Sequence, residues 1–297
     1  MPQSECAAVT IDRPSPTPPP LVPAIEDSGT SEAAAARTRL PPPPPLIPAQ
    51  AGTQVQATDA AGDAGRIAEI LAALEPVTDP ELDESVVALG FIARVAVLAD
   101  DVEVDFRLPT FWCSANFAWI MAEDMRAALR RLAWPKHADV RLVDHFAARE
   151  INDGVAAGLS FREAFEAEAA ANLGDIRETF RRKAYLGRMS RLMERLREVG
   201  WNDDRIAGLT FAALDEIRSD NETRPLIARF LERRAAYGGP SAPGDLAFRK
   251  TDGEPITAET LPAILRDIRM TRRSVEANGE MCRMLLKARI EAPAPVE

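Results

Sequence analysis

Hydrophobic residues change their spacing several times along this chain of 297 residues. From 65 to 74 they recur every three or four positions, which predicts an amphipathic helix. Residues 86–98 are largely apolar and β-branched, and in 102–108 apolar and charged residues alternate strictly. These two runs predict a pair of antiparallel strands. After residue 113 the spacing is helical again, and a last short strand is expected around 140–144.

This order of elements predicts an α+β unit over 64–147, in which helices cover one face of a small three-stranded sheet. Residues 148–297 show helical spacing only and are expected to form an all-α extension. Within it, a capping box at Ser160 should open a helix, and Asn152 and Gly154 are expected in a turn. Further helices are predicted at 175–198, 211–217, 225–236 and 261–289, the last with a break or kink at Asn278-Gly279.

Residues 1–63 differ in composition from the rest of the chain. Proline, alanine, serine, threonine and glutamine dominate, and Pro41 to Pro45 form an unbroken run. Such a stretch buries too little apolar surface to offset chain entropy, so we expect a disordered tail with polyproline II character. It lacks the apolar region of a secretory signal, and no apolar run of the chain is long enough to span a bilayer.

Charge and cysteine usage narrow the class of protein. The formal net charge of −10 argues against a general nucleic-acid-binding protein. The three cysteines, Cys6, Cys113 and Cys282, are dispersed and form no Cys-x-x-Cys motif. We therefore expect free thiols in a reducing cytoplasm, not a disulfide framework.

Cys113 stands where the strand-like spacing ends and the helical spacing begins. A thiol at a helix N-terminus meets unpaired N–H groups and the positive end of the helix dipole, which favour the thiolate. The thiolate is the form that binds soft metals. The alternative is that Cys113 packs as a small buried apolar residue.

Carboxylates and a histidine flank the ends of the same strands. Asp79 and Glu81 precede the first strand, and Asp144 and His145 follow the third. Together with Cys113 they form a candidate ligand set for iron or zinc. Simpler roles stay open: Asp79 and Glu81 could cap a turn, and His145 could bond to the backbone.

Three motifs within this unit occur in the order that is typical of a known family. They are Val77-Thr78-Asp79-Pro80-Glu81, Leu89-Gly90 and Leu108-Pro109-Thr110-Phe111-Trp112-Cys113-Ser114. On these residues the unit resembles the iron–sulfur cluster assembly domain family, which includes the PaaD and SufT proteins and the MIP-type targeting adaptors. Thr110 and Cys113 match the family's Leu-Thr-Thr-Pro-x-Cys-Pro stretch. Pro109, Phe111, Trp112 and Ser114 depart from it.

The resemblance implies an adaptor that helps to mature metalloproteins. Such an adaptor would link the cluster-assembly machinery to an apo-protein client and would hold iron or a cluster only transiently. One branch of the family accompanies multicomponent diiron oxygenases, so an oxygenase component is a candidate client. Thr110, Phe111 and Trp112, beside the thiol, are candidate docking residues.

Two features of the helical extension suggest further contacts. The predicted helix over 175–198 carries a basic cluster that would dock to an acidic partner, namely Arg181, Arg182, Lys183 and Arg188. The alternative for this cluster is a solvated face with Glu–Arg pairs. Cys282 is a candidate second thiol beside Cys113, and the alternative is a packed helix thiol.

Two functions therefore stay open. The first is a cytoplasmic maturation factor that delivers iron or an iron–sulfur cluster. The second is a non-catalytic assembly or regulatory subunit that binds an oxygenase without handling metal. We do not expect an enzyme, because the only histidines are His137, expected in a loop, and His145, so no base stands clearly beside the thiol.

Overall fold

The structure is a computed structural model that describes residues 47–48, 54–57, 62–165, 173–217, 220–237, 239 and 241–291. The disordered tail predicted over 1–63 lies outside the described residues, apart from two short strands and the start of the first helix.

The three predicted strands are present and form a mixed sheet. They are β3 (Ile92–Leu98), β4 (Asp101–Phe106) and β5 (His137–Leu142). β3 and β4 pair antiparallel, as expected, and β4 and β5 pair parallel, with Phe106 opposite Leu142. The expectation that His137 lies in a loop is wrong, because this residue opens β5 opposite Asp101.

Two short strands that the hydrophobic pattern did not predict extend the sheet beyond β3. β2 (Gln54–Ala57) pairs parallel to β3, and β1 (Ile47–Pro48) pairs antiparallel to β2, which gives the order β1-β2-β3-β4-β5. Their composition gave no strand signal; β2 forms by backbone pairing to the edge of β3, and β1 by pairing to β2.

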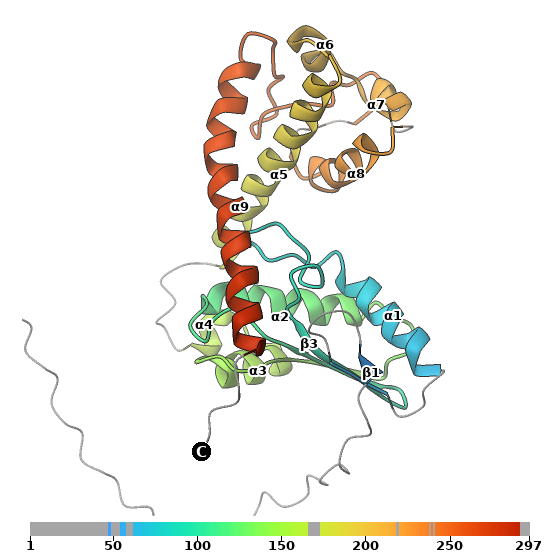
Figure 1. The fold of residues 1–297 in the computed structure, drawn as a ribbon, viewed down its shortest axis with the longest axis vertical. Coiled ribbons are helices and arrows are strands. Elements are labelled where there is room, and N and C mark those ends of the chain that lie inside the picture. The colour runs from blue at the N-terminus through green and yellow to red at the C-terminus, as the bar shows by residue number, and fades with distance from the viewer. Residues whose placement is uncertain are drawn as a thin grey trace, which may run out of the picture. The chain divides into compact units, whose positions relative to one another are not determined.

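The helices of the α+β unit cover the apolar face of the sheet. α1 (Gly62–Leu74) packs on β3, and α2 (Ala115–Leu129) packs on α1 and β5 (Figure 1). The predicted α+β class is thus confirmed. Strands β3, β4 and β5 also carry a network of ion pairs, made by Arg94, Glu103, Asp105 and Arg141.

Residues after β5 form a helix that the sequence did not predict. α3 (Ala148–Ala157) includes Asn152 and Gly154, which were expected in a turn. Gly154 is needed there for packing, since a Cβ would lie 2.5 Å from Cη2 of the buried Trp119. The capping box at Ser160 is confirmed and opens the short α4 (Phe161–Ala164).

The helical extension forms a second core. Its helices are α5 (Leu173–Glu198), α6 (Asp203–Ala207), α7 (Phe211–Ile217), α8 (Thr223–Arg234) and α9 (Leu261–Glu291). The side chains that fill this core are apolar and come from all five helices and the loops between them, among them Tyr185, Met189, Leu192, Ile206, Leu214, Phe230, Phe248 and Leu265.

Helix α9 belongs to both cores. Leu261, Leu265 and Ile268 pack in the helical core, whereas Leu286 is buried in the core of the α+β unit. The break expected at Asn278-Gly279 is absent, and the helix is continuous through it (Figure 1). The second half of α9 therefore lies against the α+β unit.

A buried ion pair joins the two cores. Asp83, in the segment before β3, accepts from Arg188 of α5 at both oxygens, with N–O distances of 2.6 and 2.8 Å. Arg188 is only 4% exposed, and its Nη1 also donates to Glu232 and to the carbonyl of Arg229, both on α8. Asp83 has a φ of 52°, a conformation that Asn and Asp tolerate better than most residues.

We expect Arg188→Met to lower the free energy of unfolding by about 3–5 kcal/mol, because it leaves the carboxylate of Asp83 buried without its main partner. Urea unfolding would measure this loss. Arg182→Met, at an exposed position of the same helix, should change stability by no more than about 0.5 kcal/mol. Adding Asp83→Asn to Arg188→Met should restore part of the loss. Equal effects of Arg188→Met and Arg182→Met would contradict this role.

Candidate functional site

The segment from 77 to 85 forms a closed turn around Asp79. The Oδ1 atom of Asp79 accepts the backbone N–H groups of Glu81 and Leu82, each at 2.9 Å. The backbone N–H of Asp79 donates to the carbonyl of Glu84 at 2.9 Å. The carboxylate therefore caps the turn, which was one of the two roles considered for it.

Burial makes the charged form of Asp79 costly. The side chain is 8% exposed, and desolvation raises the pKa of its carboxyl from 3.8 to about 6, against the lowering effect of the bonds from Leu82 and Glu81. The negative charges of Glu81 and Glu84 add to the rise. A cation close to this buried carboxyl group would stabilise its charged form.

Cys113 lies directly before Ser114, the N-cap residue of α2. Its thiol is partly exposed, and its Sγ lies 3.1 Å from Oγ1 of Thr110. The ring of His145 contacts the backbone of Cys113, since Nε2 is 2.8 Å from the carbonyl oxygen of Cys113. Nδ1 of the same ring accepts the N–H of Ala147 at 3.2 Å. These contacts require a proton on Nε2.

His145 thus holds the Cys113 loop and is not free to bind a metal. Both ring nitrogens are engaged with backbone groups, and burial lowers the pKa of the imidazole, although its bond to Cys113 acts in the opposite direction. The geometry of His145 matches the alternative role, that of a strand-end histidine bonded to the backbone. Asp144 is also engaged, in ion pairs with Arg107 and Arg289.

One stripe of α9 crosses the same region. Asn278 donates to Glu81 Oε1 at 3.2 Å, and Arg289 donates to the carbonyl of Leu108, five residues before Cys113. Leu286 lies over Gly90 of the α+β unit. Because residues four apart share a helix face, Cys282 stands between Asn278 and Leu286 on this stripe.

Cys282 therefore lies among the predicted site residues. Its partly buried thiol packs against the same core as Cys113. Burial raises the pKa of Cys282 to about 11, and the neighbouring Asp79, Cys113 and Glu81 add to the rise in that order. Cys282 thus lies in the same region as Cys113, Asp79 and Glu81, which are about 170 to 200 residues away in the sequence.

These donors do not form a finished metal site. Among the described residues, no group of three or more His, Cys, Asp or Glu side chains is placed to hold a metal ion. A further ligand or a shift of α9 would be needed for these donors to enclose a soft cation.

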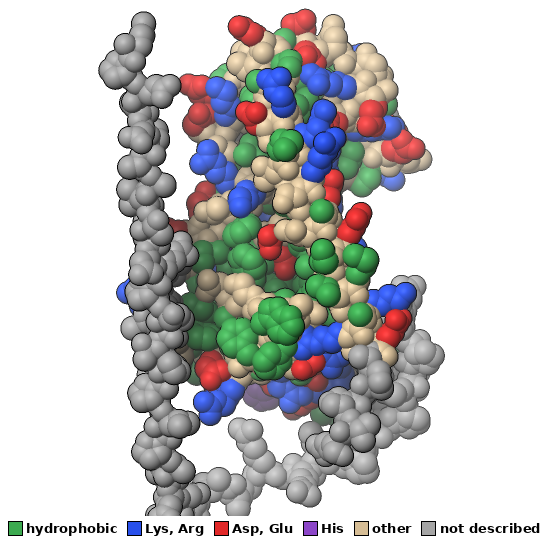
Figure 2. Space-filling model, turned by 60° about the vertical axis from the view of Figure 1, so that its left-hand side comes forward, with side chains coloured by type: hydrophobic (Ala, Val, Ile, Leu, Met, Phe, Trp, Pro, Cys, Tyr) green, Lys and Arg blue, Asp and Glu red, His purple; other side chains and the backbone are tan. Residues whose placement is uncertain are grey.

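Exposed aromatic side chains surround the Cys113 loop. Phe111 is 47%, Trp112 75% and Phe146 55% exposed, so the two aromatics of the motif do not bury the thiol. The ring centres of Phe111 and Phe146 are 6.4 Å apart, and the N–H of Phe146 donates to the carbonyl of Phe111. Figure 2 shows hydrophobic side chains gathered on one face of the molecule. Phe146 was missed in the sequence, although it directly follows His145.

One member of the basic cluster of α5, Arg188, is used inside the protein. Docking through Arg188 is ruled out by its burial and its ion pairs with Asp83 and Glu232. Sequence spacing could not show this, because the acidic partners come from other segments. Arg181, Arg182 and Lys183 are exposed.

Comparison with protein families identifies the α+β unit. Residues 67–142 match the family model described as iron-sulfur cluster assembly protein, about a quarter of the chain. The unit is an iron–sulfur cluster assembly domain. The suspected resemblance is thereby confirmed, and the assembly domain supports a role in iron–sulfur cluster assembly. Neither the search of curated proteins nor that of solved structures returned a match.

Among the described helices, none is long and apolar enough to cross a membrane.

The pKa of Asp79 gives a test of its burial. Since the folded-state pKa is raised, the carboxyl stabilises the fold while protonated, below about pH 3.8, and this contribution is lost as the pH rises through about 6. Relative to Asp79→Asn, the wild type should lose about 3 kcal/mol of unfolding free energy over this interval.

Chemical denaturation of both proteins at a series of pH values measures this difference. Asn keeps an oxygen for the two backbone N–H groups, so the turn should survive the substitution. Asp153→Asn, at an exposed position of α3, is the matched control. Parallel stability curves for the wild type and Asp79→Asn would show that Asp79 is not buried as described.

Proposed function

We propose that this protein is a non-catalytic maturation factor that delivers iron or an iron–sulfur cluster to a metalloprotein client. One observation supports the proposal: Cys282 of α9 packs against the same core as Cys113 of an iron–sulfur cluster assembly domain, and Asn278, one turn before Cys282, bonds to Glu81. Both thiols are free, which suits a reducing cytoplasm.

The chemistry of these donors suits iron as cargo. Thiolates bind soft and borderline metals and clusters, and carboxylates add harder ligands and negative charge. An incomplete ligand set favours transient binding, because a client ligand can complete the coordination and then take the metal. The proposed roles are thus Cys113 and Cys282 as thiol ligands, with Asp79 and Glu81 as neighbouring carboxylates.

The aromatic residues around the thiol offer a place for the client. Exposed aromatic side chains are enriched at protein interfaces, and Phe111, Trp112 and Phe146 stand beside Cys113. Thr110, which contacts the thiol, belongs to the same loop. The helical extension would then select the client, for which a component of a diiron oxygenase is our candidate.

A second candidate function is a regulatory or assembly subunit that binds an oxygenase without metal. The absence of a described three-donor group and the exposure of Trp112 favour it. Iron binding separates the two candidates.

Anaerobic equilibrium dialysis of the full chain against ferrous iron is the test. We expect the wild type to bind iron and Cys113→Ser to bind it at least about tenfold more weakly. Loss of a residue that only orients a metal ligand already lowers metal affinity by about this factor, and loss of the ligand itself should lower it at least as much. Cys282→Ser should also weaken binding. Cys6→Ser, which removes the third thiol, is the matched control and should bind like the wild type.

Each result decides between the candidates. Iron binding that is lost with Cys113→Ser, while circular dichroism shows an intact fold, supports the maturation factor. A wild-type chain that binds no iron under these conditions, yet forms a stable complex with an oxygenase component, would favour the metal-free subunit.

A further inference from the structure

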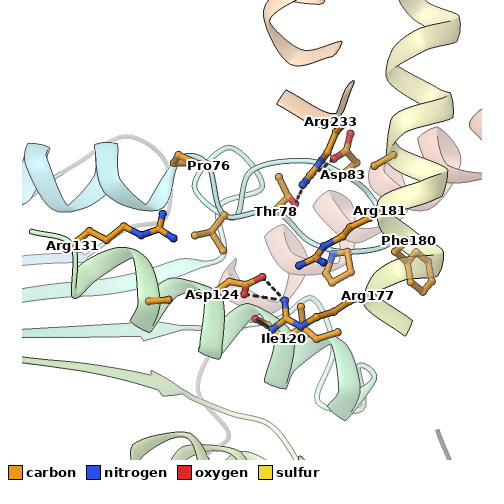
Figure 3. A pocket seen from close by; sticks show the side chains of 14 residues that line it. Pro76, Thr78, Asp83, Ile120, Asp124, Arg131, Arg177, Phe180, Arg181 and Arg233 are labelled. Atoms are coloured by element: carbon orange, nitrogen blue, oxygen red, sulfur yellow. Dashed lines mark hydrogen bonds and ion pairs between the residues drawn. The ribbon is translucent and has the colours of Figure 1, made fainter. Parts of the chain in front are cut away.

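A second site lies on the other side of the 76–80 segment, away from the thiols. An open cavity of about 210 Å³ is lined by this segment, α2, α5 and Arg233 of α8. Figure 3 shows its lining, in which Arg131 and Arg181 reach in from opposite sides. The cavity therefore touches both the assembly domain and the helical extension.

The cavity carries an excess of positive charge in an acidic protein. Four arginines line it, Arg131, Arg177, Arg181 and Arg233, against two aspartates, Asp83 and Asp124. Asp124 pairs with Arg177 at 2.8 Å, and Asp83 is already neutralised by Arg188 at 2.6 Å.

Two of the four arginines are unused. The guanidinium groups of Arg131 and Arg181 form no hydrogen bond or ion pair with the residues that the structure describes. By contrast, Arg177 also pairs with Glu123, and Arg233 donates to Thr78. An anion between two such cations gains attraction from both of them.

The size of the cavity limits the ligand. Cavities that hold drug-sized molecules are about 300–1,000 Å³, so this one suits a smaller molecule. Its walls include the apolar residues Ile120, Phe180 and Pro80, and the polar lining consists of Thr78, the two aspartates and the four arginines. Guanidinium groups bind carboxylate and phosphate oxygens in pairs of parallel hydrogen bonds.

We propose that this cavity binds a small anion of the phosphate or carboxylate class, held between Arg131 and Arg181. The anion bridges α5 and the turn that follows α2, and it contacts the segment that leads into Asp79. It thereby stabilises the junction between the two cores. The inference does not depend on iron handling by Cys113.

Titration calorimetry of the full chain with inorganic phosphate and, separately, with citrate tests the proposal. We expect saturable binding in at least one of the two series, and the series with the higher affinity identifies the ligand class. Arg131→Gln and Arg181→Gln should each weaken binding about tenfold or more, because each removes charge-assisted hydrogen bonds. Both variants should stay folded, since neither guanidinium has a partner in the described structure.

Arg182→Gln is the matched control, because Arg182 is exposed next to Arg181 on α5 but does not line the cavity. It should bind like the wild type. Binding that is equally weak in Arg181→Gln and Arg182→Gln would reveal a general charge effect and overturn the proposal. The absence of saturable binding of both anions to the wild type would also overturn it.

Discussion

The bidentate ion pair between Asp83 and Arg188 is the contact on which the arrangement of the site depends. It fixes the segment from 77 to 85 against α5. Arg188 also donates to Glu232 and to the carbonyl of Arg229, and these bonds connect the pair to α8. Breaking such a buried pair costs far more than an exposed pair contributes. The same segment contains Asp79 and Glu81, so the ion pair that joins the two cores also positions the carboxylates.

Helix α9 completes this arrangement from the other side. Its first half is held by the helical core and its second half by the assembly domain, so the position of Cys282 depends on both cores. Gly279 lies next to this domain, since a Cβ there would lie 3.3 Å from Glu84 Oε1. The helical extension thus contributes a candidate thiol, Cys282, that residues 67–142 do not contain.

Local sequence signals predicted local structure well. The alternation in 102–108 and the helical spacing after Cys113 identified β4 and α2, and Ser160 with Glu163 identified a helix start. Features that depend on distant partners could not be read from the sequence. The strand β2 exists through pairing with β3. The burial of Arg188 was not predicted, because its acidic partners lie 105 and 44 residues away in the sequence. For the same reason, the sequence suggested Cys282 as a second thiol but could not show which elements surround it.

Thiol labelling tests the central claim, that Cys113 and Cys282 handle iron together, most directly. The full chain is alkylated anaerobically with and without ferrous iron and sulfide, and the labelled cysteines are quantified by mass spectrometry, with Cys6 as the internal reference. We predict that iron slows the alkylation of Cys113 and Cys282 together and leaves Cys6 unchanged. Alkylation of Cys113 and Cys282 at the same rate with and without iron would contradict the claim.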